Sequence, residues 1–388
     1  MTEQLHNRYA SWAKLNVRPS AQVRDRDGVF DRGLWQALAR EEFFKLLAPQ
    51  ERGGVGATPR QFASAFRGLA FGSLDIPWVL SVGAHAGVAT SLLLAFGSSE
   101  QIDRYLPGFI DGSCIAGVSN SEPGAGTDLR AMRSQILPEH EDAFRGTIRK
   151  SAANNIGVGD LAITSAQKLR PDGKISFEVF LLDLAQATER AQLSLGGFRT
   201  GDVGSLHFED FAVDCAACQL GGDGSGSLVL RRCFDLERLL LGELIAGTLG
   251  ALLELAVSYA WQRQSAGRRL AEHQYIQEKV CIIFSAHECI DALLGRLWEE
   301  GNTRFPSNNA RLSHLKFVAV EKGLAAAQAY LELCGMSGYQ SDNPAQKLMR
   351  DLLGLLALGG TKELHKITLF DAISEAAGFR PCRELSDG

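Results

Sequence analysis

Apolar residues recur at helical spacing through the first part of the chain. The period predicts helices over residues 34–47, 60–72 and 78–96, and the segment 99–106 predicts the start of a further short helix. Apolar stripes of this kind cover one side of a helix and are buried by packing against one another. We therefore expect an N-terminal helical domain over residues 1–115.

The pattern changes to short alternating apolar runs over residues 116–222. The runs 160–165, 176–182 and 205–211 are bounded by Gly, Pro and Asp, which is typical of strands separated by turns. Alternation places successive side chains on opposite faces of a sheet, so one face of each run can be buried. Residues 116–222 are therefore predicted to form a small β domain.

A glycine-rich run, 221–227, follows and is interpreted as a hinge. Beyond it the apolar period is again helical, over residues 228–264, 271–300, 308–337 and 343–378. Four long helices with short connections predict a helical bundle over residues 223–388. The expected fold class is α+β, with an N-terminal α-helical domain, a middle β domain and a C-terminal four-helix bundle.

Composition excludes several partners. The chain has 388 residues, 45% of them hydrophobic, and a net charge of -5 with Lys and Arg scattered, so it offers no basic surface for nucleic acid or an anionic membrane. We see no signal-peptide core and no uninterrupted apolar run of membrane-spanning length, and expect a cytoplasmic protein. Cys215 and Cys218 form a lone CxxC, so no metal site is expected.

The stretch Ser119 to Asp128 carries the first chemical signal. Glycine frees the backbone, proline fixes it, and hydroxyl and amide groups line the Ser-Glu-Pro-Gly-Ala-Gly-Thr run, which suits a loop around a flat, polar ligand. An ordinary surface turn explains such a run equally well. Its meaning therefore depends on the rest of the chain.

The order of helical, β and helical domains, with this loop at the start of the β domain, resembles the acyl-CoA dehydrogenase family of flavoenzymes. Further segments that carry the resemblance are Phe96 to Gln101 with Tyr105 to Pro107, Gly197 to Arg199 with Leu206 to Asp210, Arg263 to Gly267 with Gln274, and Gly335 to Tyr339 with Lys347 to Asp351 and Gly360 to Thr361. The resemblance covers essentially the whole chain. It implies FAD as cofactor, an acyl thioester on CoA or a carrier protein as substrate, and an electron-transferring flavoprotein as partner.

The resemblance also implies cofactor contacts. The matching positions are Ser119, Ser121, Thr127, Ser151, Ala152, Arg263, Gln274, Glu332, Gly335, Thr361 and Glu363. Ser121 and its neighbouring backbone amides match positions that hydrogen-bond the pyrimidine edge of the flavin in the family. Arg263 and Gln274 match positions that reach the FAD of a neighbouring subunit, which implies a homo-oligomer, a tetramer or a dimer; the alternative for Arg263 is a solvated charge at a helix end.

The central question is which carboxylate removes the α-proton of the substrate. Most members of the family carry it just before the Gly-Thr of the C-terminal motif, where this chain has Gly359. A minority place it on the first long helix of the C-terminal bundle, before an arginine, and here Glu237 precedes Arg238. The helical neighbours of Glu237 are apolar, so burial is expected to raise its pKa toward that of a useful base. Glu243 is a weaker rival because it lacks the motif.

The resemblance assigns further roles around the reacting carbons. Asp235, Arg238 and Gly360 match substrate-binding positions, and Gly359 counts as catalytic through its backbone N–H, which would hydrogen-bond the enolate oxygen together with a flavin ribityl hydroxyl. After residue 146 the family's usual aromatic residue falls on Lys150.

The family's threonine falls on Ala152, unless the register slips by one residue and Ser151 serves. The family's phenylalanine before Gly267 is here Ala266. These departures disfavour an ordinary β-oxidation role and leave room for a divergent, biosynthetic member that acts on a carrier-protein thioester. Two alternatives stay open: a flavin-dependent monooxygenase or oxidase on the same scaffold, which Lys150 and Ala152 favour and Glu237 disfavours, and a non-catalytic member.

Overall fold

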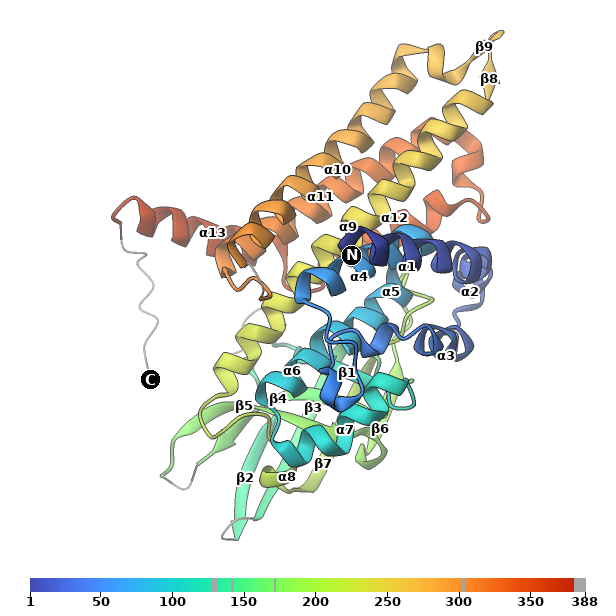
Figure 1. Cartoon of the computed structure of the whole chain (residues 1–388). Helices are drawn as coiled ribbons and strands as arrows, with labels where there is room; N and C mark the ends of the chain where they lie inside the picture. The colour runs from blue at the N-terminus through green and yellow to red at the C-terminus, as the bar shows by residue number, and fades with distance from the viewer. Residues whose placement is uncertain (127–130, 141–142, 171, 302–303, 380–388) are drawn as a thin grey trace.

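The computed structural model describes the whole chain except residues 127–130, 141–142, 171, 302–303 and 380–388. Helices come first, strands follow, and long helices complete the chain (Figure 1). The α+β class is therefore confirmed.

The N-terminal helices are α1 (Thr2–Asn16), α2 (Ala21–Asp27), α3 (Arg32–Arg40), α4 (Pro59–Ser73), α5 (Ile76–Val82), α6 (Thr90–Phe96) and α7 (Ser99–Asp111), with a π-helical segment η4 (Gly83–Ala89) between α5 and α6. Short 3₁₀ turns are η1 (Arg18–Ser20), η2 (Phe43–Lys45), η3 (Gln50–Arg52), η6 (Leu184–Gln186), η7 (Leu270–Glu272) and η8 (Gly335–Tyr339). The helix predicted over 34–47 ends early, because Glu42 adopts a left-handed conformation with φ 65°. The sequence prediction missed α1 and α2.

Close backbone approach explains how α1 is held. Gly68 and Gly72 of α4 face it, and a Cβ at Gly68 would lie 2.2 Å from the carbonyl oxygen of His6. The buried residues of α1 are Tyr9, Ala10 and Ala13, so one tyrosine and two alanines make the contact rather than a broad apolar stripe. A weak stripe of this kind is hard to detect by periodicity.

The strands form one seven-stranded sheet. They are β1 (Ala116–Ser119), β2 (Gln135–His140), β3 (Ala143–Asn154), β4 (Leu161–Leu169), β5 (Ile175–Asp183), β6 (Glu189–Gln192) and β7 (Val203–Val213). The predicted runs 176–182 and 205–211 fall within β5 and β7, and the run 160–165 begins one residue before β4. The register of β3 against β7 shifts between Lys150 and Ala153, and Ala152 adopts φ 54°, which marks a β-bulge at this point.

The C-terminal helices are α8 (Cys215–Cys218), α9 (Gly226–Gln262), α10 (Gln274–Gly301), α11 (Asn309–Cys334), α12 (Pro344–Gly354) and α13 (Lys362–Ala376), with a hairpin of β8 (Gln264–Ser265) and β9 (Arg268–Arg269) between α9 and α10. The prediction of a single helix over 343–378 is wrong. The helix α12 ends at Gly354, and the turn that follows contains Gly359 and Gly360, whose φ of 66° and 98° redirect the chain into α13. As a result α13 projects from the body of the molecule (Figure 1).

The interpretation of the run 221–227 as a hinge is also wrong. The buried Glu178 carboxylate accepts hydrogen bonds from the amides of Gly224, at 2.7 Å, and Gly226, at 3.2 Å, and Gly221 donates to the carbonyl of Phe96 at 2.8 Å. A Cβ at Gly226 would lie 1.8 Å from the carbonyl oxygen of Phe177. These glycines allow close contact, so the run is a fixed joint between the sheet and α9.

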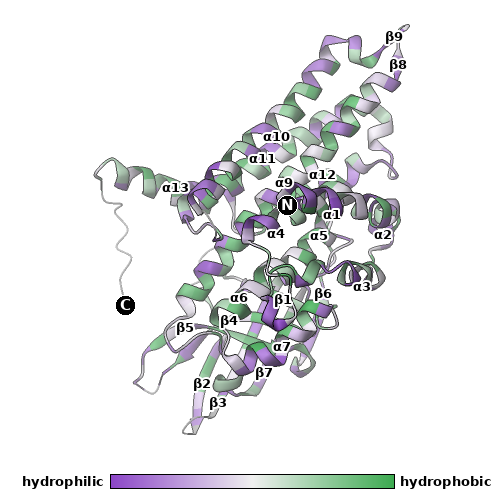
Figure 2. Ribbon diagram, viewed as in Figure 1, coloured by the Kyte–Doolittle hydropathy of each residue, from purple (hydrophilic) through white to green (hydrophobic). Residues whose placement is uncertain are grey.

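Two helical segments are candidate membrane spans, although polar residues interrupt the apolar run in both. Ile76–Phe96 and Gly226–Gln262 are long and apolar enough by length and composition, but 72% of the apolar window of each is buried inside the protein. They contribute many of the apolar residues visible in Figure 2 and belong to the main hydrophobic core. Core helices of a folded domain have this character.

A buried network of charges joins the parts of the chain. Lys347 of α12 donates to Asp75 at 2.7 Å, just before α5, and to Asp351 at 2.6 Å, and all three side chains are fully buried. Arg24 of α2 also pairs with Asp75, at 2.8 Å. Asp351 accepts a hydrogen bond from the amide of Phe198 at 2.8 Å, in the loop that leads into β7. The network therefore fixes helices from both ends of the chain to the β domain.

Lys347→Met tests this network. The substitution leaves Asp351 buried without a cation, which typically costs about 3–5 kcal/mol of the free energy of unfolding. Lys366→Met is the control, because Lys366 pairs with Glu321 at 3.4 Å on the surface and such pairs contribute less than about 1 kcal/mol. Urea unfolding of both variants measures the difference. Equal losses would contradict a structural role for the network.

Candidate active site

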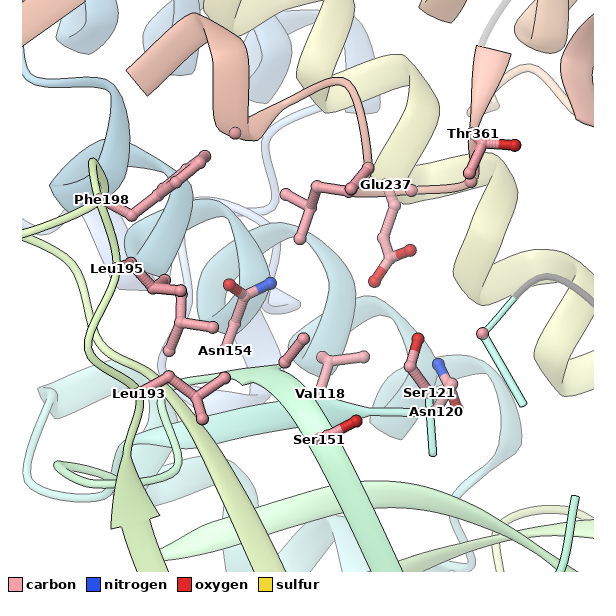
Figure 3. A pocket seen from close by; sticks show the side chains of 18 of the residues that line it. Val118, Asn120, Ser121, Ser151, Asn154, Leu193, Leu195, Phe198, Glu237 and Thr361 are labelled. Carbon is pink, nitrogen blue, oxygen red and sulfur yellow. The ribbon is translucent and has the colours of Figure 1, made fainter. Parts of the chain in front are cut away.

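A cavity of about 730 Å³ lies between the sheet, α9 and the turn that connects α12 to α13 (Figure 3). Its walls include Asn120, Ser121, Ser151, Ala152 and Asn154 from the sheet, Leu193, Leu195 and Phe198 from the segment before β7, Glu237 and Arg238 from α9, and Gly359, Gly360 and Thr361 from the turn. The sheet side is polar in part, and the opposite wall carries one carboxylate. Such a cavity is large enough for a drug-sized ligand.

Half of the predicted site residues meet at this cavity. Those that line it are Ser121, Ser151, Ala152, Glu237, Arg238, Gly359, Gly360 and Thr361. Ser119 and Asp235 are buried but do not line it, and Glu363 is exposed in the first turn of α13. Thr127 lies outside the described residues.

Four predicted cofactor residues lie far from this cavity. Arg263 ends α9, Gln274 begins α10, and Glu332 and Gly335 end α11, at the tip of the bundle away from the sheet (Figure 1). All four are exposed, and Glu332 pairs with Lys279 at 2.6 Å. The structure therefore does not bring them to the cavity of their own chain.

Glu237 points its carboxylate into the cavity from α9 (Figure 3). Burial raises the pKa of Glu237 to about 7, and Arg238 opposes this shift only in part. The Arg238 guanidinium donates instead to the side chain of Asn309, at the start of α11. Over the described ranges of the chain, the Glu237 carboxylate has no hydrogen-bond donor and no ion-pair partner. A carboxylate in this setting can take and release a proton near neutral pH.

Glu243, the rival carboxylate, is engaged elsewhere. Its two oxygens accept from Arg67 Nε at 2.6 Å and from Trp298 Nε1 at 2.7 Å. Glu243 is buried on a side of α9 that does not face the cavity. These contacts join α4, α9 and α10, which is a structural role.

The turn at Gly359 and Gly360 is fixed by two buried residues. The ring Nε2 of His365 donates to the Gly359 carbonyl at 3.1 Å, and Lys316 Nζ donates to the Gly360 carbonyl. Burial, followed by the nearby Arg238, lowers the pKa of Lys316 to about 8 and that of His365 to about 4. No described oxygen accepts from the amides of Gly359 or Gly360. These two N–H groups are therefore available to an oxygen of a ligand.

Lys150, at the position of the family's aromatic residue, turns away from the cavity. Its Nζ pairs with Glu122 at 2.7 Å, and both side chains are buried. Burial opposes the charge on Glu122, but hydrogen bonds from Lys150, Ser134 and Arg133 keep its pKa below the usual value. The pair anchors the loop that carries Ser121 to β3.

Ser151 and Ala152 both face the cavity, as a result of the bulge in β3. Ser151 also donates its amide to the Ser121 carbonyl at 2.9 Å. Of these two residues, only Ser151 offers a hydroxyl to a ligand.

Sequence reasoning missed three residues of this site. Lys316 and His365 act through carbonyls that are distant in sequence, although a lysine on the buried face of α11 was a detectable signal. Asn154 lines the cavity at the end of β3. Its neighbour Asn155 is structural, because its amide donates to the carbonyls of Ser81 and Ala116 at 2.9 and 3.1 Å. The two consecutive asparagines at the end of this strand were the feature of the sequence that could have indicated a polar site here.

The fold has a helical domain, a β domain and a second helical domain in this order, and the cavity lies where the sheet meets the C-terminal helices. Family models of the acyl-CoA dehydrogenase N-terminal domain and C-terminal domain match residues 2–113 and 224–374. The chain belongs to the acyl-CoA dehydrogenase family. This confirms the resemblance and the expectation of an oxidoreductase that acts on CH–CH bonds.

Curated relatives match over nearly the whole chain. The mitochondrial isovaleryl-CoA dehydrogenase of Solanum tuberosum is 25% identical over 95% of this chain and 89% of its own length. An acyl-CoA dehydrogenase of Bacillus subtilis is 25% identical over 92% of this chain and 94% of its own length.

Solved structures share the fold. The prolyl acyl carrier protein oxidase AnaB has a TM-score of 0.89 at 23% identity and covers 96% of this chain and 98% of its own. Butyryl-CoA dehydrogenase from Megasphaera elsdenii has a TM-score of 0.86 at 21% identity, with 96% and 97% covered. At this identity the likeness establishes the fold alone.

The raised pKa of Glu237 generates a prediction. Between its ordinary value of 4.5 and about 7, the folded protein holds a proton on Glu237 that the unfolded chain has lost, so stability from this group is lost as pH rises through about 7. Glu237→Gln carries no such proton. We expect its free energy of unfolding to rise relative to wild type by more than about 1 kcal/mol between pH 5 and pH 8. Urea unfolding at intermediate pH values measures this, and a constant difference would contradict it.

Proposed function

We propose that the chain catalyses α,β-dehydrogenation of an acyl thioester, with Glu237 as the base that removes the α-proton. The observation that carries the proposal is the position of Glu237. Its carboxylate has no cationic partner among the described residues, has a pKa near 7, and faces the polar sheet wall of the cavity. The family's more common base position is Gly359, which has no side chain. The α-proton would move to a Glu237 oxygen.

FAD is the cofactor of this family, and one solved neighbour is an FAD complex of PigA, with a TM-score of 0.88. When bound, FAD supplies the acceptor for the hydride that leaves the β-carbon. The residues present fit a flavin on the sheet side, where Ser121 and Ser151 offer hydroxyls and the loop offers backbone amides. Ala152 leaves space at the same wall. These residues would orient the ring and exclude water from it.

The turn after α12 would stabilise the thioester oxygen. The amides of Gly359 and Gly360 have no acceptor among the described residues, and their carbonyls are fixed by His365 and Lys316. Fixed N–H donors aimed at a developing oxyanion need no reorganisation during the reaction. Arg238, which lines the cavity, stays as a proposed contact for the more distant part of the substrate, whereas Asp235 does not reach the cavity.

The acyl carrier is the same chemical group in both candidate substrates, since CoA and carrier proteins both present a pantetheine thioester. The names of the neighbours include a butyryl-CoA dehydrogenase and a prolyl acyl carrier protein oxidase, so the fold serves both kinds of substrate. An electron-transferring flavoprotein is our proposed electron acceptor. The oxidase named among the neighbours supports oxygen as the second candidate, and formation of hydrogen peroxide during turnover would identify it.

Glu237→Gln tests the base directly. It keeps the size of the side chain and removes the proton acceptor, so FAD content should persist while anaerobic reduction of the flavin by substrate falls by roughly 10²-fold or more. Glu243→Gln is the matched control on the same helix. It should lower stability, through Arg67 and Trp298, without an equal fall in rate. Flavin reduction in Glu237→Gln at the wild-type rate would refute the assignment.

We also propose that the protein is a homo-oligomer in which the tip of one bundle completes the cofactor site of a neighbour. Arg263 and Gln274 are exposed at that tip, beside the large exposed apolar side chains of Trp261, Tyr275, Met336 and Tyr339. Exposed apolar patches of this kind mark interaction surfaces. Closed symmetric assemblies are the common outcome for such surfaces.

Arg263→Ala tests this arrangement. A guanidinium fork suits the FAD pyrophosphate, so its removal should weaken FAD retention by about tenfold or more while the fold persists. Arg60→Ala, at an exposed position of α4, is the control and should retain FAD as wild type does. Retention is measured by flavin release on dilution, and assembly by sedimentation. A monomer that holds FAD tightly would contradict the proposal.

A further inference from the structure

A second, much smaller cavity of about 20 Å³ continues the main cavity past Glu237. Both cavities share Glu237, Asn154, Leu358 and Gly359, so the smaller one lies directly beside the proposed reacting carbons. A space of 10–15 Å³ on this measure holds about one water molecule. The end of the acyl site therefore has room for about one methyl-sized group.

Close packing closes this end of the site. The ring of Phe66 would lie 2.8 Å from a Cβ at Gly83, and Leu240 Cδ1 would lie 2.3 Å from a Cβ at Gly87. Both side chains fill the space that the two glycines of η4 leave, and both are buried. Interiors packed in this way do not open for a longer chain without a large cost. A long acyl chain cannot extend past Glu237.

Asn154 is the polar group at the junction of the two cavities. Its side chain points into the main cavity between apolar neighbours, Val118 and Leu195 (Figure 3). Asn154 is only 7% exposed, and across the residues that the structure describes its side-chain amide makes no hydrogen bond. When a ligand excludes water from the cavity, this amide needs a partner on the ligand. An unpaired buried polar group costs about 1–3 kcal/mol.

We propose that the acyl group is short and carries a hydrogen-bonding N–H or O–H group, and that Asn154 recognises this group. The inference rests on the proposed function, because it places the acyl group beside Glu237. A hydrocarbon acyl group of the same size would leave the Asn154 amide unpaired. Sites built to hydrogen-bond a substrate discriminate strongly against the analogue that lacks the polar group.

A matched pair of substrates tests the recognition. Prolyl and cyclopentanecarbonyl groups have the same ring size and differ by an N–H in place of a methylene. Both are offered as pantetheine thioesters, which are common to CoA and carrier-protein substrates, and anaerobic flavin reduction is followed. We expect wild type to prefer prolyl by at least about tenfold, in accord with the cost of an unpaired amide. Asn154→Leu should bring the ratio near one, and the surface variant Asn7→Leu should keep it.

Chain length is tested with octanoyl and butyryl thioesters. Wild type should react with butyryl at least about tenfold faster than with octanoyl, because the wall of Phe66 and Leu240 stops the longer chain. Leu240→Ala should reduce this difference by opening the wall. If its stability loss of about 2–5 kcal/mol prevents folding, Leu240→Val provides a milder opening. Equal rates with octanoyl and butyryl in wild type would overturn the length limit.

Other outcomes separate this inference from the proposed function. Equal reduction by the two ring substrates in wild type, or an unchanged ratio in Asn154→Leu, would overturn the recognition by Asn154. A further contrary outcome is that Asn154→Leu changes the flavin spectrum or loses FAD while the ratio of prolyl to cyclopentanecarbonyl reduction stays unchanged. That result would show that Asn154 contacts the cofactor, and it would equally overturn recognition of the acyl group by Asn154. If no thioester reduces the flavin, dehydrogenation is wrong, and the ligand preference is then measured from perturbation of the flavin spectrum on binding.

Discussion

The buried contact of Lys347 with Asp75 and Asp351 is the constraint on which the site depends. It ties the start of α5 to α12, and Asp351 fixes the amide of Phe198, whose ring lies at the cavity. Charges in the interior are stable only when they are paired and hydrogen-bonded, so this geometry permits little variation. Because α12 leads directly into the Gly359 turn, the network also sets where that turn meets α9.

The other buried glutamates of the described chain all have partners, and this comparison shows what is unusual about Glu237. Glu122 pairs with Lys150, Glu243 with Arg67, and Glu178 accepts from backbone amides of the joint before α9. Glu237 has no such partner within the described chain. Burying a carboxylate without a partner costs stability unless it holds a proton. Natural proteins keep such a cost where function requires it, which is the physical basis for assigning the base to this residue.

Local patterns were predictable from sequence, and contacts between distant segments were not. The apolar surroundings of Glu237 follow from spacing along one helix, and the order of helices and strands follows from period. The turn between α12 and α13 depends on the positive φ of Gly359. A glycine pair permits such an angle, but its presence in the sequence does not show that the chain turns there. The roles of Lys316 and Asn154 depend on which carbonyl or cavity each one meets. The helix α1 was missed because its buried face is one tyrosine and two alanines rather than a broad apolar stripe.

The loss of a side chain at Gly359 and the gain of a carboxylate at Glu237 have a common physical consequence. Gly359 adopts φ 66°, which disfavours residues with a side chain, and the turn can therefore be tight enough for His365 and Lys316 to hold its carbonyls. No described oxygen accepts from the two amides, which leaves them for the thioester oxygen in the proposed reaction. The base that we propose on α9 is carried by a long helix packed on both sides, so it needs no support from the turn. The proposed reaction thereby divides proton removal and oxyanion stabilisation between two elements, and each can be rigid for its own task.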